Sequence, residues 1–144
     1  MESHLLGAYS YAVSKPIDFS RPGLTQAGAW NYLREEITVG LVRRRPVRIA
    51  QIFDDHVESA PNSVMPSNYI AYLLAQIINF CFTDTSYEVS IQNRRERWRD
   101  LRASLERWKE DLPSSFQPFS VAAKSDNPFP SIWMLQPWHG MLTL

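Results

Sequence analysis

The sequence has 144 residues, about the length of one domain, and its 15 basic and 15 acidic residues give a formal net charge of zero. This balance argues against a free-standing binder of nucleic acid or of acidic membranes, because both need an excess of positive charge. Hydrophobic residues make up 44% of the chain, which is enough for a packed core and argues against disorder over the whole length.

The first two predicted helices lie in the N-terminal third of the chain. A short helix is expected over residues 3–14, and a longer one over residues 22–44. Ser20 is the expected N-cap of the longer helix, Pro22 suits its first turn, and Pro46 stops it. Its apolar residues recur every three or four positions, as in a helix: Leu24, Ala27, Trp30, Leu33, Ile37 and Leu41.

The third predicted helix opens at Pro66 and covers residues 69–82, the longest apolar run of the sequence. This run has 14 residues, whereas a bilayer crossing needs about 20, so we expect a buried central helix and no membrane span. Its two amides, Gln76 and Asn79, are expected either to pair with a neighbouring helix or to orient a small-molecule effector in a pocket.

The fourth helix is predicted over residues 86–112 and carries an apolar stripe at heptad spacing. Its many arginines alternate with acids, which favours a solvated outer face over direct contact with DNA. We expect the stripe to be internal core, with a partner interface as the alternative, and its central residues are Trp98, Leu101, Leu105 and Trp108.

A fifth helix is predicted from Ser131, with a kink or a later start at Pro137. The segments 46–65 and 113–130 are expected to be irregular links. The predicted fold class is therefore all-α, with about five helices. Because the last helix has barely begun at residue 144, we expect residues 1–144 to be an incomplete part of a larger helical domain.

Chemistry-bearing motifs are sparse, and the sequence predicts no catalytic residue, no metal ligand and no enzyme. Asp54, Asp55 and His56 are adjacent and cannot easily converge on one ion, so a solvated acidic loop is expected. His139 is expected to be a hydrogen-bonded core residue, and Cys81, the single cysteine, to be an inert core thiol. The cluster Arg43, Arg44, Arg45 and Arg48 is read as helix C-terminal charge, with a nuclear import signal or an anion contact as alternatives.

Six stretches in order resemble one known family. They are HLLGA at 4–8, GAWNYLREEI at 28–37, RRPVRI at 44–49, LLAQIINFCF at 73–82, RWRDLRASLERWKEDLPSSFQP at 97–118 and FPSIWMLQPWH at 129–139. Together they resemble the fungal-specific transcription factor regulatory domain, the helical region downstream of a binuclear zinc-cluster DNA-binding module. The last two stretches are the more specific parts, and the resemblance covers nearly the whole chain.

The resemblance implies an all-α regulatory region of a nuclear protein that regulates transcription by RNA polymerase II. It implies no catalytic residues, and it implies protein partners or self-association through helical faces. The family's DNA-binding module holds two zinc ions with six cysteines, and this chain has one cysteine. DNA binding and zinc are therefore expected only in a module absent from residues 1–144. The alternatives are an effector-sensing helical domain and a truncated remnant that acts only as a protein-binding module.

Overall fold

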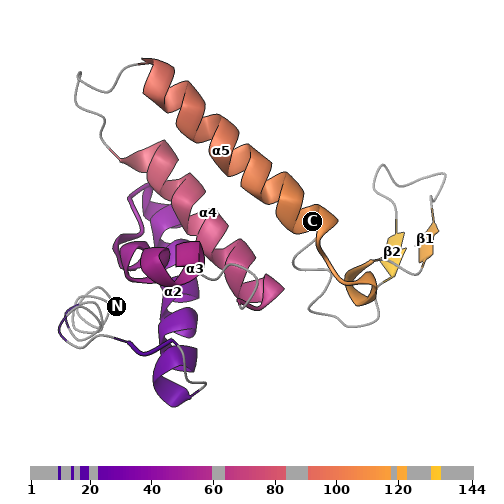
Figure 1. The fold of residues 1–144 in the computed structure, drawn as a ribbon, viewed down its shortest axis with the longest axis horizontal. Coiled ribbons are helices and arrows are strands. Elements are labelled where there is room, and N and C mark those ends of the chain that lie inside the picture. The colour runs from indigo at the N-terminus through magenta and orange to yellow at the C-terminus, as the bar shows by residue number, and fades with distance from the viewer. Residues whose placement is uncertain are drawn as a thin grey trace. The chain divides into compact units, whose positions relative to one another are not determined.

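The computed structural model describes Ser10, Ser14 and residues 17–19, 23–59, 64–83 and 91–117, together with the backbone of 120–122 and 131–133. The chain divides into two compact units, Met1–Leu105 and Glu106–Leu144. The first unit contains α2 (Leu24–Arg43), the 3-10 helix η1 (Arg48–Phe53), α3 (Asp54–Ser59) and α4 (Pro66–Phe82) (Figure 1). It also contains most of α5 (Ile91–Glu110), which continues into the second unit.

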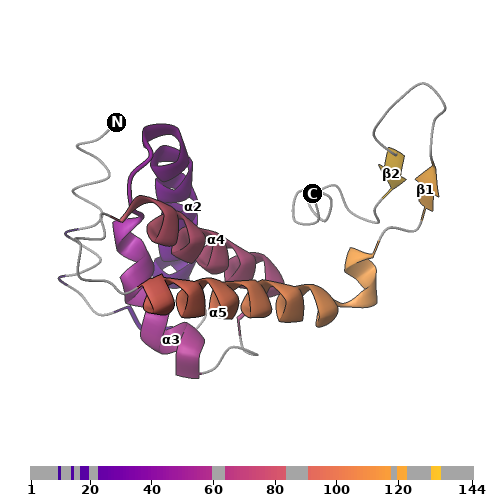
Figure 2. The same cartoon turned by 90° about the horizontal axis from the view of Figure 1, so that it is seen from above.

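The core of the first unit lies where α2, η1 and α4 pack together, and α4 crosses α2 in both views (Figures 1 and 2). Each of these elements turns one apolar side inward, because helical spacing places its buried residues on one face. The buried cluster consists of Ala29, Trp30, Leu33, Ile37, Val47, Ile49, Ala50, Phe53, Val57, Val64, Tyr72, Ala75 and Ile78.

Phe53, at the end of η1, is the aromatic centre of this core and is fully buried. Its ring lies 4.3 Å from that of Trp30 on α2 and 5.2 Å from that of Phe19, measured between centroids. Phe19 in turn stacks on His56 of α3 at 4.6 Å. Such tilted and offset ring pairs add to the free energy gained by burying the rings, so η1 and α3 are held to α2 by aromatic contacts.

The three long helices predicted from periodicity are present, with ends that differ by a few residues. α2 starts at Leu24. The preceding Gly23 has extended backbone and, as a glycine, no side chain that could cap the helix. The predicted cap Ser20 and the segment 84–90 lie outside the described residues. Of the predicted helix over 3–14, Ser10 and Ser14 are helical, and its other positions also lie outside the described part.

The segment 46–65 is not an irregular link as predicted, since it contains η1 and α3. Ile49, Phe53 and Val57 recur every four residues and are all buried, which is the signature of an amphipathic helical segment. Asp54 and Asp55 occupy the first turn of α3, where negative charge is favourable at the positive end of the helix dipole. Because prolines lie near both ends of this segment, an irregular link was predicted from the sequence, and the helical periodicity between them was missed.

The second unit contains the 3-10 turn η3 (Ser114–Phe116) and two three-residue strands, β1 (Ser120–Ala122) and β2 (Ser131–Trp133). The strands pair antiparallel, with Val121 opposite Ile132. The helix predicted to start at Ser131 is therefore wrong for residues 131–133, where a β-branched and an aromatic residue follow Pro130 and favour extended backbone. Its continuation through Pro137 lies outside the described residues.

The all-α class is confirmed, with four α-helices in the described residues beside this one short ladder. Within the same part of the chain, no helix combines the length and the apolar character that a membrane crossing requires.

Candidate functional site

The C-terminal end of α2 forms a tight turn that returns the chain to α4. Arg44 adopts the left-handed conformation, with φ of 51°, and the Arg45 N–H donates to the Gly40 carbonyl at 3.0 Å. A Cβ on Gly40 would lie 3.1 Å from both the Arg45 carbonyl oxygen and Val47 Cγ2, so a larger residue there would crowd the turn. Arg43, Arg44 and Arg48 are exposed around this turn, and Arg45 is half-buried.

Two polar side chains hold the backbone that follows this turn. Asn79 of α4 accepts a hydrogen bond from the Val47 N–H at 2.6 Å and donates to the Val47 carbonyl at 3.1 Å. Glu36 of α2, 6% exposed, accepts from the Ile49 N–H at 2.8 Å. These side chains satisfy backbone groups of the link after α2 and of the first turn of η1, which have no partner within a helix.

A chain of hydrogen bonds joins α3, α4 and α5. The Tyr72 hydroxyl and Gln76 Nε2, both on α4, donate to the same oxygen of Asp54 at 2.7 and 3.0 Å. Arg97 of α5 donates to Gln76 Oε1 at 2.9 Å. Burial raises the pKa of Tyr72, and the hydrogen bond to Asp54 raises it further, because both favour the neutral phenol.

The N-terminal half of α5 rests on α4 around the ring of Phe80. Trp98 stacks on this ring at 5.9 Å between centroids, and the Arg94 guanidinium lies 4.4 Å from its centre. Arg94 also donates to the Phe80 carbonyl at 3.3 Å. This part of α5 therefore contacts α4 through a stacked ring, a cation–π contact and a hydrogen bond.

The predicted core stripe of α5 is split by the fold. Leu101 and Trp108 are buried, at 5% and 8% exposure, as predicted. Trp98 is 47% exposed and Leu105 36%, so assigning these two to the core is wrong. The two lines of the heptad lie on neighbouring sides of the helix, and the line of Leu101 is turned farther inward than the line of Trp98.

Gln76 and Asn79, the amides singled out from the sequence, both lie on α4 but serve different partners. Gln76 connects Asp54 to Arg97, and Asn79 binds Val47. Each amide uses both its oxygen and its nitrogen in these bonds. The contacts match the packing role considered for them.

The remaining candidates are dispersed. Asp54 is hydrogen-bonded rather than part of a solvated loop as predicted, and His56 stacks on Phe19. Cys81, expected in the core, is exposed near the end of α4. Among the residues that the structure describes, no group of three or more acids, histidines and cysteines could hold a metal ion. His139 lies outside the described part.

Arg34 was missed by the sequence reading. From α2 it donates to the Trp30 carbonyl at 3.0 Å, to the Ser67 carbonyl at 3.3 Å and to Asn68 Oδ1 at 2.6 Å, which ties α2 to the start of α4. Burial lowers its pKa. Glu36 and Tyr72 were also missed. The sequence did contain a signal for Glu36, because it lies beside Leu33 and Ile37 on the apolar side of a helix. A charged residue in that position is expected to need a buried hydrogen-bond partner.

Comparison of the chain with known protein families found no family model that matches. Neither the curated proteins nor the solved structures contain a match to it.

Proposed function

We propose that residues 1–144 form a regulatory and interaction region of a fungal RNA polymerase II transcription factor that acts in the nucleus. DNA binding and zinc belong, in this proposal, to a zinc-cluster module outside these residues. The proposal assigns no catalytic residue and no cofactor to this chain. It places the function in helical surfaces that contact protein partners or a second copy.

One observation carries the proposal: stretches that resemble the family come together in a single core. GAWNYLREEI contributes Trp30, Leu33 and Ile37 of α2. RRPVRI contributes Val47 and Ile49, and LLAQIINFCF contributes Ala75 and Ile78. Apolar residues of three of the six stretches therefore pack in one core, as expected if these stretches belong to one domain.

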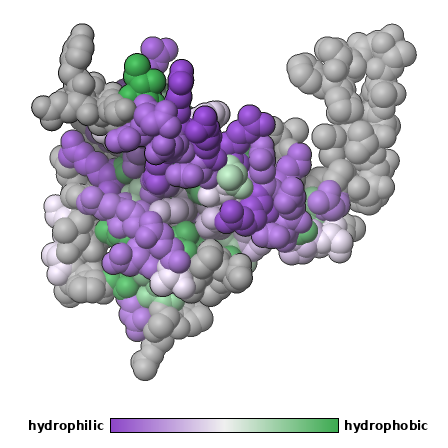
Figure 3. Space-filling view, turned by 45° about the horizontal axis from the view of Figure 1, so that its top comes forward, coloured by the Kyte–Doolittle hydropathy of each residue, from purple (hydrophilic) through white to green (hydrophobic). Residues whose placement is uncertain are grey.

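Charge also supports a role in protein contact over direct DNA reading. The chain is neutral overall, and exposed arginines of α5 share the helix with Glu96, Asp100, Glu106 and Glu110. Figure 3 shows that hydrophilic side chains cover most of the coloured part of one face of the molecule. Phosphate binding needs a positive surface without such acids. The effector-sensing alternative has less support, because Gln76 and Asn79 are already engaged with protein groups.

A reporter assay tests this function. A heterologous DNA-binding domain and an activation domain are joined either by this chain or by a flexible linker of similar length. We expect the chain to change reporter output severalfold, because a regulatory region restrains or promotes activation. Ala75→Asp, which places a charge in the core, should abolish the change, whereas the exposed Arg48→Glu should retain it.

Equal output from the chain and the linker, with both fusions present at equal levels, would contradict the proposal. Mapping the ends of the transcript supplies a second test. An in-frame six-cysteine cluster upstream of residue 1 is the expected result.

A further inference from the structure

The outward side of α5 carries apolar side chains at heptad spacing. Ile91, Trp98 and Leu105 follow one another at intervals of seven residues and are 74%, 47% and 36% exposed. We name these three residues the outward stripe. Seven residues make nearly two helical turns, so the three side chains lie along one side of the helix.

The contacts that hold α5 in the first unit leave much of this side exposed. Leu101, on the neighbouring line, is 5% exposed, and Arg94 and Arg97 reach α4 from the inward side. Trp98 places part of its ring on Phe80 and keeps the rest in solvent. The outward stripe therefore lies at the edge of the contact with α4, where Trp98 touches Phe80 and Ile91 and Leu105 remain exposed.

Positive charge borders most of the outward stripe, and one acid, Glu106, lies on the same border, roughly 80° from the stripe. At about 100° per residue, Arg95 lies roughly 40° from the stripe and Arg99 roughly 100° from it. Glu96 and Asp100 lie roughly 140° or more away. Arg95 and Arg99 are exposed, and residues 91–106 contain five arginines against three acids, a net charge of +2. We name Arg95 and Arg99 the basic rim.

We propose that the outward stripe and the basic rim bind an acidic amphipathic helix of a partner protein. Apolar residues at heptad spacing match the stripe of a second helix, and carboxylates beside that stripe would meet the basic rim. This inference deepens the proposed function by naming the chemistry of the partner. The binding assay below uses the chain alone, so it can fail while the reporter assay succeeds.

Two other occupants fit the surface less well. A second copy of α5 would bring one basic rim against another, which costs free energy between like charges. A nucleic acid could stack a base only on the exposed part of Trp98, because Ile91 and Leu105 on either side of it offer no ring.

The test measures fluorescence anisotropy of labelled probes titrated with the full chain. The main probe is a synthetic helix of about 20 residues with leucine at heptad spacing and flanking glutamates. Its controls are the same peptide with lysine in place of glutamate, a scrambled peptide and a single-stranded oligonucleotide. We expect the acidic peptide to bind best and its affinity to fall as salt is added, because salt screens the rim.

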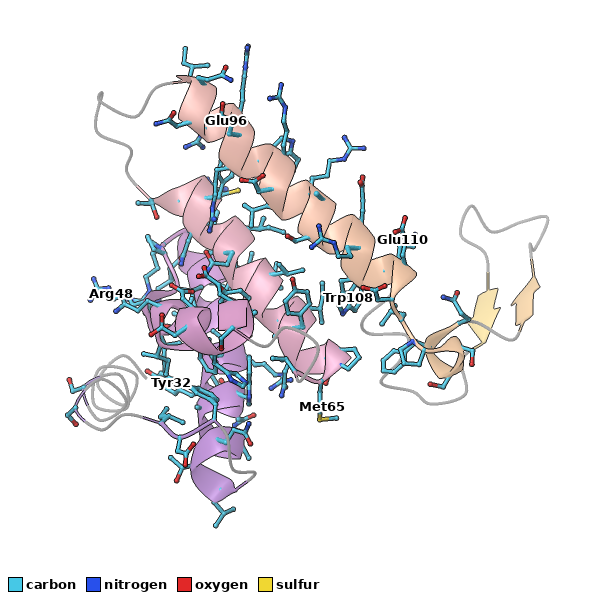
Figure 4. The ribbon with its side chains drawn as sticks, viewed as in Figure 1. Tyr32, Arg48, Met65, Glu96, Trp108 and Glu110 are labelled. Atoms are coloured by element: carbon cyan, nitrogen blue, oxygen red, sulfur yellow. The ribbon has the colours of Figure 1, made fainter. Side chains whose placement is uncertain are left out.

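Matched variants locate the site. Ile91→Ser and Arg95→Glu should each weaken binding about tenfold, since each removes one element of the surface. Val42→Ser, at a similarly exposed apolar position on α2, and Arg48→Glu should leave binding unchanged. Arg48 projects from η1 on the side away from α5 (Figure 4). Circular dichroism confirms that each variant keeps its helix content.

Several results would overturn the inference. These are no binding of the acidic peptide, equal binding of the lysine or scrambled peptide, and tighter binding of the oligonucleotide. Equal losses in the Val42 and Arg48 variants would also overturn it, as would sedimentation showing a dimer that Ile91→Ser dissociates.

Discussion

Tyr72 illustrates how one polar atom decides the role of a buried residue. The ring lies in the core at 7% exposure, and its hydroxyl donates to Asp54 at 2.7 Å. A phenol in this position ties α4 to the start of α3 while its ring adds to the buried apolar surface. The same surroundings raise the pKa of Tyr72, first through burial and then through the hydrogen bond.

Removing that hydroxyl should cost stability at neutral pH. Tyr72→Phe loses a hydrogen bond to a carboxylate, which corresponds to about 1.5–3 kcal/mol of unfolding free energy. Urea denaturation followed by circular dichroism measures the loss. Asp54 keeps its bond from Gln76 in this variant, so a loss above this range would show that the network acts cooperatively.

The raised pKa of Tyr72 also predicts a difference at alkaline pH. Its stabilising effect is complete below the ordinary pKa of 10.0 and is lost above it, because the unfolded chain ionises there first. Between about pH 8 and about pH 11 the wild type should therefore lose more stability than Tyr72→Phe. Parallel losses in the two proteins would contradict the pKa assignment.

At the scale of elements, α5 shows that a heptad pattern defines lines of side chains without assigning them to a partner. Leu101 is buried, whereas Trp98, one turn earlier on the other line, remains half-exposed on Phe80. Figure 4 shows how side chains leave α5 on several sides. The size of a side chain is therefore a poor guide to its contribution to stability here.

Alanine substitutions on α5 test this ordering. Leu101→Ala should cost about 2–5 kcal/mol, as buried leucines do. Trp98→Ala should cost less than the roughly 3–5 kcal/mol of a buried tryptophan, because only part of its ring is covered. Chemical denaturation of both variants gives the comparison. A larger loss of unfolding free energy in Trp98→Ala than in Leu101→Ala would show that Trp98 contributes to stability as a core residue does.

α2 contains two glycines with opposite expected responses to alanine. Gly28 is exposed and a Cβ there meets nothing within 4 Å, so Gly28→Ala should stabilise the helix by about 0.5–1 kcal/mol. At Gly40 the Cβ would crowd a backbone carbonyl and Val47. We expect Gly40→Ala to destabilise by about 1–3 kcal/mol. Thermal denaturation of the two variants tests this expectation. An equal gain of stability in both would show that the turn at Gly40 can shift to accept a Cβ at little cost.

At the scale of the whole molecule, the first unit depends on a core shared by segments distant in sequence. Phe53 contacts Trp30 and Phe19, and α4 closes the same cluster with Tyr72 and Ala75. Each of these segments alone buries too little apolar surface to be stable. We therefore expect α2, η1 and α4 to form and unfold together.

Phe53→Ala tests this cooperativity. The substitution should cost about 3–5 kcal/mol, because it leaves a cavity at the centre of the aromatic cluster. Hydrogen exchange should then accelerate together in the amides of α2, η1 and α4. Faster exchange confined to η1 would show that the three elements are independently stable.

The sequence alone determined the three long helices and the all-α class, because their apolar periodicity is strong and local. It also identified Gln76 and Asn79 as polar residues that need partners. The tertiary structure decided that Val47 pairs with Asn79, that 46–65 contains η1 and α3, and which line of α5 faces inward. These outcomes depend on contacts between residues far apart in the chain. Periodicity defines the face of a helix, but the partner of that face is set by how the whole chain packs.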